Sequence, residues 1–286
     1  IDDIECSYLR KISRLSCHGS KRTVFFNMSS FPKVRDLVVS RNDITEIPEH
    51  TFQEYSQLRR LLITHNHVEN VYLNCFDGLK FLNELNLQNN KIKIIRKNTF
   101  SLLEYLKILD LNSNLIDTIE ENSFFGLKLL NDINLFNNKI KKIERKLFVG
   151  MPILRIIYLA SNGIDSMEID SFYDMNNLND LLDLFGNNIK ALYNNSFYGL
   201  KNLRKLNLRE NLIEILQNGY FNGLNNLNEL NLNKNKIRTI KKHSFFGLER
   251  LRKLDLENNV IEIIEEESFY GLKNVIELEL ASQNIS

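Results

Sequence analysis

Leucine, isoleucine and other large apolar residues recur along the chain with a period of 24 residues. One repeat holds them, with one asparagine, at Leu106, Leu109, Leu111, Asn114, Ile116, Ile119, Phe124 and Leu127. The alternation of leucine with other residues predicts a short strand that buries one face. Because a single repeat cannot cover its own apolar face, we expect successive repeats to stack into one continuous core.

Two columns of residues mark the period most clearly. Asparagine occupies the first, at Asn42, Asn66, Asn90, Asn114, Asn138, Asn162, Asn187, Asn211, Asn235 and Asn259. Phenylalanine occupies the second, at Phe52, Phe76, Phe100, Phe124, Phe148, Phe172, Phe197, Phe221, Phe245 and Phe269. An asparagine amide can satisfy main-chain groups of adjacent turns, and aromatic rings fill a wide interior. We therefore predict structural roles for both columns.

The pattern L-x-x-L-x-L-x-x-N-x-I-x-x-I-x-x-x-x-F-x-x-L resembles the extracellular leucine-rich repeat family in its 24-residue, Phe-containing form, as in Toll-like, Slit-type and hormone-receptor-type ectodomains. The resemblance covers residues 34–286 as ten full repeats plus one partial repeat. It implies an α/β fold: a leucine-rich repeat solenoid, curved and right-handed, with a parallel concave sheet and an irregular or short-helical convex side. Residues 1–33 resemble part of a cysteine-bearing N-terminal cap.

The cap resemblance implies a disulfide between Cys6 and Cys17, because caps shield an open end of the core and secretion permits oxidation. The alternative is two free thiols. Family caps usually carry four cysteines, so either upstream residues are missing or this cap is reduced. Cys75 is expected to be a small buried thiol. The last repeat is partial and no cysteine cap follows it, so we expect the natural protein to continue beyond Ser286.

Three N-x-S sequons are candidates for glycosylation if the protein is secreted. They begin at Asn27, Asn194 and Asn284.

Composition and motifs narrow the classes of function. Lys plus Arg number 37 and Asp plus Glu number 36, so the net charge of +1 gives no bulk attraction for nucleic acid or anionic membrane. No apolar run approaches the ~18 residues of a membrane span, so we expect no membrane contact by this segment itself. The sequence has no H-E-x-x-H, G-x-S-x-G, phosphate-loop or G-x-G-x-x-G motif. We predict no enzyme, no catalytic residues, no metal and no cofactor.

The residues between the buried strand positions should face the concave surface, and most of them are polar. Apolar exceptions gather in the middle of the chain, at Ile108, Phe136, Ile156, Tyr158, Leu181 and Phe185. Three aspartates border them, at Asp110, Asp132 and Asp183. Because four strands span only about 15 Å, we predict one patch with a polar rim, typical of a protein-binding surface. The alternative is incidental aromatic content, partly covered by a glycan or a neighbouring loop.

One repeat is a residue longer than the others. The extra residue lies between Phe172 and Asn187 and enters the strands of the predicted patch. We hypothesise that it bulges the backbone and re-aims Leu181 and Phe185. The alternative is neutral length drift, since loops tolerate insertion.

A second aromatic series directly follows the phenylalanine column. Its members are Phe125, Tyr173, Tyr198, Phe246 and Tyr270. We predict accessory packing for these rings, with contact to a partner as the alternative.

The resemblance implies an extracellular protein-binding module. We expect the ligand-recognition ectodomain of a receptor or adhesion protein, either secreted or part of a membrane protein, that binds a protein ligand on its concave face. The alternative is a secreted matrix or carrier scaffold that forms a homodimer or binds soluble protein partners. Nucleic acid is not the expected ligand, because the concave charges alternate in sign.

Overall fold

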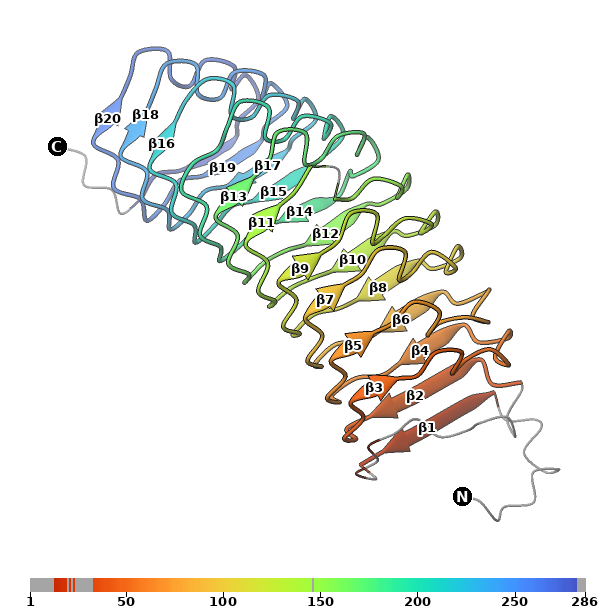
Figure 1. The fold of residues 1–286 in the computed structure, drawn as a ribbon. Coiled ribbons are helices and arrows are strands. Elements are labelled where there is room, and N and C mark those ends of the chain that lie inside the picture. The colour runs from red at the N-terminus through yellow and green to blue at the C-terminus, as the bar shows by residue number, and fades with distance from the viewer. Residues whose placement is uncertain (1–12, 20, 22, 24–32, 146, 282–286) are drawn as a thin grey trace, which may run out of the picture. The chain divides into compact units, whose positions relative to one another are not determined.

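The computed structural model describes residues 13–281 except 20, 22, 24–32 and 146. The chain divides into two compact units, Ile1–Asn134 and Leu135–Ser286, and each is described by itself. In both units every repeat contributes one long strand to a parallel sheet, as the leucine pattern predicts (Figure 1). Each repeat is thus one turn of a parallel-strand solenoid.

The sheet of the first unit is built from strands in sequence order. They are β1 (Arg14–His18), β2 (Asp36–Ser40), β4 (Arg60–Leu62), β6 (Glu84–Asn86), β8 (Ile108–Asp110) and β10 (Asp132–Asn134). Equivalent positions of successive repeats are register partners, as for Leu61 with Leu85. Strand β1 lies in the segment predicted to be a cap, and it pairs with β2 in parallel. The cap boundary at residue 33 stays a prediction.

The sheet of the second unit follows the same rule. Its strands are β12 (Ile156–Tyr158), β14 (Leu181–Asp183), β15 (Lys205–Asn207), β17 (Glu229–Asn231), β19 (Lys253–Asp255) and β21 (Glu277–Glu279). The register steps by one repeat at each pair, for example from Leu206 to Leu230.

Two-residue strands form separate, smaller sheets. In the first unit β3 (Glu46–Ile47) pairs with β5 (Asn70–Val71), and β7 (Ile94–Ile95) with β9 (Thr118–Ile119). In the second unit β11 (Lys142–Ile143) pairs with β13 (Ser166–Met167), and β18 (Thr239–Ile240) lies between β16 (Ile215–Leu216) and β20 (Ile263–Ile264).

The phenylalanine column fills the core of both units, as predicted. The rings of Phe100 and Phe124 in the first unit are parallel, with centroids 6.2 Å apart. The rings of Phe221 and Phe245 in the second unit are 6.1 Å apart. All four side chains are buried, so each contributes a large apolar area to the core.

The asparagine column forms an internal ladder, which confirms its predicted structural role. Asn90 is typical: its amide donates to the carbonyl of Ile63 at 2.7 Å and to that of Leu87 at 2.9 Å. Its Oδ1 accepts from the amide N–H of Val68 at 3.1 Å. The side chain therefore bonds buried main-chain groups of successive turns, and neighbouring rungs share acceptors, since Leu87 O also accepts from the amide of Asn114 at 3.0 Å.

The segments that return the chain to the next strand are irregular. Within the residues that the structure describes there is no helix, so the α/β class and the short-helical convex side need correction, and the irregular alternative holds. Reverse turns follow one another instead, as in the bonds from Tyr55 N to Phe52 O and from Leu58 N to Tyr55 O. A left-handed residue opens many of these segments, for example Asn98 at φ 60°, and interrupts any helical run.

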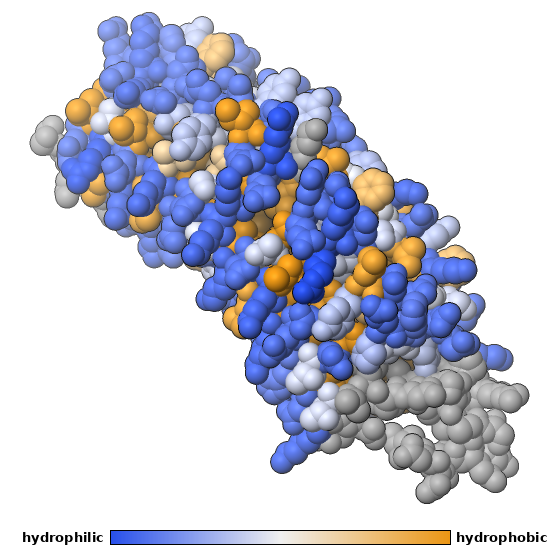
Figure 2. All heavy atoms as spheres, in the orientation of Figure 1, coloured by the Kyte–Doolittle hydropathy of each residue, from blue (hydrophilic) through white to orange (hydrophobic). Residues whose placement is uncertain are grey.

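The surface in view is mostly hydrophilic, with hydrophobic side chains scattered among charged ones (Figure 2). None of the described segments is a helix long and apolar enough to cross a bilayer.

Candidate functional site

The candidate site lies on the sheet face, by which we mean the outward side chains of the long strands. In β12 and β14 the middle residue is buried and its two neighbours are only partly covered. This is the expected result of strand alternation, because successive side chains point to opposite faces. The core therefore fixes the backbone, and the flanking positions are available for contact.

In the second unit the strands bring four of the predicted residues together. Ile156 of β12 is the register partner of Leu181 of β14, and Tyr158 is the partner of Asp183. All four side chains are half-buried. Phe136 precedes these strands in the chain and is 40% exposed. An apolar pair and an aromatic–carboxylate pair thus lie side by side on two hydrogen-bonded strands.

Phe185 follows β14 and is partly covered. The guanidinium of Arg209 lies over its ring, 5.7 Å from the centroid, and also forms an ion pair with Glu210 at 3.3 Å. A cation over an aromatic face is attracted by the ring quadrupole. One face of the Phe185 ring is therefore screened by a charged group, which a ligand would have to displace or bind.

The other three predicted residues belong to the first unit. Ile108 is 41% exposed and is the register partner of Asp132. Asp110 is the partner of Asn134. A single surface formed by all nine residues stays a prediction.

The aspartates do more than border the patch. Asp183 Oδ1 accepts from the main-chain N–H of Phe185 at 3.1 Å and from the amide of Asn207 at 2.9 Å. Asp110 Oδ1 accepts from both the main-chain N–H and the side-chain amide of Asn112. Burial raises the pKa of both carboxyl groups, although these hydrogen bonds act in the opposite direction.

The sequence carries a signal for this bonding pattern that the predictions from periodicity did not include. Several long strands of both units carry Asn or Asp at the same position, and six of these side chains bond the main-chain N–H two residues later. The bonded side chains are Asn86, Asp110, Asp183, Asn207, Asn231 and Asp255. Asparagine and aspartate commonly make such local turns. The column therefore holds the ends of the strands, whatever else it contacts.

The extra residue of the long repeat lies immediately before β14. In an ordinary repeat the N–H of the residue before the long strand donates to the residue before the preceding long strand, as Lys107 N does to Asn83 O. Arg204 N instead donates to Asn179 O, two residues before β14. Asn179 and Asp180 thus stand opposite one residue of the next repeat, which is the arrangement of a β-bulge. The effect of the bulge on ligand binding stays a hypothesis.

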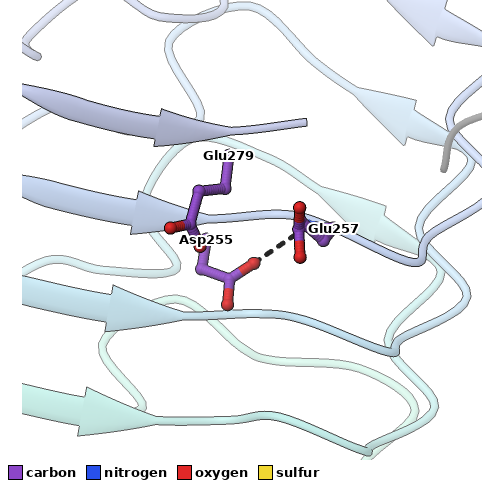
Figure 3. Close-up of side chains that lie close together, drawn as sticks. All are labelled: Asp255, Glu257 and Glu279. Carbon is purple, nitrogen blue, oxygen red and sulfur yellow. Dashed lines mark hydrogen bonds between the residues drawn. The ribbon is translucent and has the colours of Figure 1, made fainter. Parts of the chain in front are cut away.

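Three carboxylates gather at another part of the sheet face of the second unit. Asp255, Glu257 and Glu279 point toward one another, and their oxygens lie within 4.8 Å (Figure 3). Asp255 accepts two bonds of 3.1 Å from the amide of Asn233, and Glu279 pairs with the Lys253 ammonium at 3.0 Å. Because these neighbours already satisfy the group, we assign no metal site to it.

The predicted modification sites are only partly within the described residues. Cys6, Asn27 and Asn284 lie outside them, so the disulfide to Cys17 and two of the sequons stay predictions. Asn194 is exposed, as a glycosylated residue must be. Cys75 is fully buried, which confirms its predicted role, and burial raises the pKa of its thiol.

A family profile described as leucine rich repeat matches most of the chain. The matched segments are residues 32–92, 80–140, 130–189, 180–237, 201–261 and 225–285. No curated protein matches the chain at a significant level.

Solved structures share the fold over most of this chain. TLR13, in its complex with ssRNA13, is 26% identical with a TM-score of 0.81, over 94% of this chain and 43% of that one. Toll, in the Drosophila Toll–Spatzle complex, is 22% identical with a TM-score of 0.78, over 98% and 42%. The leucine-rich repeat domain of APL1B is 20% identical with a TM-score of 0.72, over 88% and 71%. The chain spans less than half the length of the first two.

Proposed function

The chain belongs to the leucine-rich repeat family, and we propose that it is the ligand-recognition region of an extracellular receptor or adhesion protein, with a protein ligand on its sheet face. The observation that carries this proposal is the paired, partly exposed Ile156 and Leu181, with Tyr158 and Asp183 beside them. Tyrosine in an apolar surround is a common anchor of protein interfaces. The proposal includes no catalytic role.

The neighbouring strands show why this pair stands out. At the equivalent position of β15 and β17, Lys205 and Glu229 form an ion pair of 2.9 Å, and Lys253 and Glu277 do so at 3.0 Å on β19 and β21. Opposite charges there satisfy one another across the sheet. Ile156 and Leu181 instead present apolar area whose removal from water would favour binding.

Ligand-bound relatives support a recognition role and widen the ligand class. Toll is seen with Spatzle, and TLR13 with ssRNA13. The complex of TLR13 with ssRNA13 gives no support to the expectation that nucleic acid is disfavoured as a ligand. The lysines of the sheet face are paired with glutamates, which still argues for a protein ligand. Lysines paired in this way do not neutralise phosphates, so they do not release the counterions that drive nucleic-acid binding.

The alternative is a secreted matrix or carrier protein that self-associates through the same residues. In that case the ligand is a second copy of this chain, and the mass in solution would rise with concentration.

A display experiment tests the proposal. The immobilised chain is exposed to an array of secreted proteins and ectodomains, and every bound protein is retested on Tyr158→Ala and on Lys205→Ala. A ligand of the sheet face should lose about 2 kcal/mol or more, roughly 30-fold in affinity, with Tyr158→Ala. The Lys205→Ala control removes only an exposed ion pair and should change little.

Two further arms separate the other readings. Single-stranded RNA that binds with a Tyr158-dependent affinity, while no array protein does, would replace the protein ligand by nucleic acid. A dimer that Tyr158→Ala dissociates in sedimentation would replace it by self-association. If every ligand found binds both variants as it binds the original chain, the sheet-face site is wrong.

A further inference from the structure

A hollow lies on the turns that follow the buried phenylalanines of the second unit. Its volume is about 350 Å³, and its walls are Tyr173, Asp174, Asn176, Tyr198, Lys201 and Asn225, with Gly199 and Gly223. These residues come from three successive repeats and none of them belongs to a long strand. The hollow is therefore separate from the proposed sheet-face site.

The two tyrosines were expected to add packing, but about half of each residue is exposed. Tyr173 is 48% exposed and Tyr198 is 51% exposed. Elsewhere in the same series Tyr270 stacks on Phe246, with centroids 6.2 Å apart and planes within 4°. Tyr173 and Tyr198 have no such ring contact among the described residues, so part of each ring is available to a ligand.

Asp174 is an unusual residue at its position. The equivalent residue in the other repeats of the second unit is glycine, at Gly150, Gly199, Gly223, Gly247 and Gly271, always with positive φ. Asp174 keeps the left-handed backbone, at φ 64°, without being glycine. Its carboxylate accepts from the amide of Asn176 at 3.1 Å. The result is a carboxylate at the wall of the hollow.

Lys201 differs from its counterpart in a later repeat. The lysine at the equivalent position three repeats later is matched by a glutamate in the preceding repeat, in the Lys273–Glu249 pair of 3.1 Å. Beside Lys201 the equivalent residues are Asn176 and Asn225. No described carboxylate pairs with Lys201. Its ammonium is thus left with three donors that can serve a ligand.

We propose that this hollow binds the pyranose ring of a saccharide. Such a ring has an apolar face of C–H groups and a rim of hydroxyls. The open rings of Tyr173 and Tyr198 match the apolar face, since aromatic side chains offer rigid, amphipathic contact area. The carboxylate of Asp174, the amides of Asn176 and Asn225 and the ammonium of Lys201 supply both acceptors and donors for the hydroxyls. The volume is in the range of small-molecule sites.

The glycines let the turns that form the walls of the hollow stack closely. Gly223 has φ 95°, and a Cβ there would lie 3.2 Å from the Cα of Tyr198. A side chain at this position would therefore push the two turns apart. The same close approach explains why successive turns can bring three repeats to one small ligand.

Saturation-transfer NMR tests the proposal with methyl β-D-glucopyranoside, methyl N-acetyl-β-D-glucosaminide and methyl β-D-glucuronide. We expect transfer to the ring C–H protons of at least one glycoside, and an affinity at least tenfold weaker with Tyr198→Ala. Lys201→Gln should weaken the glucuronide more than the neutral glycosides. Tyr270→Ala is the matched control, because Tyr270 belongs to the same series and is 55% exposed but does not line the hollow.

Two results would overturn the proposal: no transfer to any of the three glycosides, or equal transfer in Tyr198→Ala and the original chain. Circular dichroism of each variant checks that it folds, and Tyr198→Phe, which keeps the ring, should retain binding. The source of the saccharide is decided by comparing a free oligosaccharide with a glycopeptide that carries it. Tighter binding of the glycopeptide indicates a glycoprotein partner, and equal binding a free glycan. Because no sheet-face residue is changed, the outcome is independent of the protein-ligand proposal.

Discussion

Replacing Asn211 by alanine would remove one rung of the internal amide ladder. The Asn211 amide donates to Leu184 O at 2.9 Å and to Leu208 O at 3.1 Å, and its Oδ1 accepts from Ile189 N at 3.1 Å. Both carbonyls keep a second donor: the amide of Asn187 bonds Leu184 O at 3.0 Å, and the amide of Asn235 bonds Leu208 O at 2.9 Å. The variant therefore leaves one main-chain group without a partner, the N–H of Ile189.

A buried polar group that loses its partner costs about 1–3 kcal/mol, so we expect Asn211→Ala to lower the free energy of unfolding by about 1–3 kcal/mol. That is a substantial share of the roughly 5–15 kcal/mol that stabilises a typical domain. Alanine also leaves a small cavity, which adds to the loss. The expected effect is therefore well above the error of a denaturation curve.

Urea unfolding followed by far-UV circular dichroism measures the loss, since the chain has no tryptophan to report by fluorescence. Asn188→Ala is the control, because Asn188 is exposed and its hydrogen bond, from its N to Ile164 O at 2.8 Å, belongs to the main chain. If Asn211→Ala unfolds at the same urea concentration as Asn188→Ala, the amide ladder does not stabilise the fold.

Three other outcomes are expected. Burial raises the folded-state pKa of Asp183 above its ordinary 3.8, so ionisation of this carboxyl group destabilises the folded chain as pH rises. Asp183→Asn should therefore have a higher urea midpoint than the original chain at pH 7 but not below pH 3.8. A variant with the same midpoint as the original chain at both pH values would contradict this. Gly199→Ala should lower the melting temperature more than Gly247→Ala. Both glycines have positive φ, but only a Cβ at Gly199 would collide with a carbonyl oxygen. Equal decreases in melting temperature would exclude the collision. A Cys6–Cys17 disulfide predicts one reactive thiol per urea-unfolded chain and three after reduction; three before reduction would exclude it.

The fold followed from the sequence because its periodic residues have no other arrangement that satisfies them. A buried asparagine at every turn needs main-chain partners one repeat away, and a phenylalanine at every turn needs a ring above and below. The turns were less predictable. Residues such as Asn98 take left-handed backbone conformations that are set by their neighbours in the adjacent turn, and no helical periodicity reveals them.

The sequence predicted the candidate site only where the alternation of buried and outward residues along a strand decides which side chains face outward. Tyr158 and Leu181 point outward because the middle residue of each strand must be buried. The screening of Phe185 by Arg209 depends on two rotamers in different repeats and has no sequence signal. The exposure of Tyr173 and Tyr198 was missed for a related reason, because the path of each turn decides whether a ring packs or remains open.

In strands such as β12 and β14 one residue is buried and two face outward, and substitutions at these two kinds of position are selected for different reasons. Substitutions at the middle position, such as Leu182, disturb packing and are removed for their effect on stability. Substitutions at outward positions such as Ile156 and Leu181 leave the core unchanged, so they can accumulate while the chain still folds. A lineage can therefore explore new ligands by single substitutions on one face, and duplicating a repeat supplies more such positions with the packing already in place.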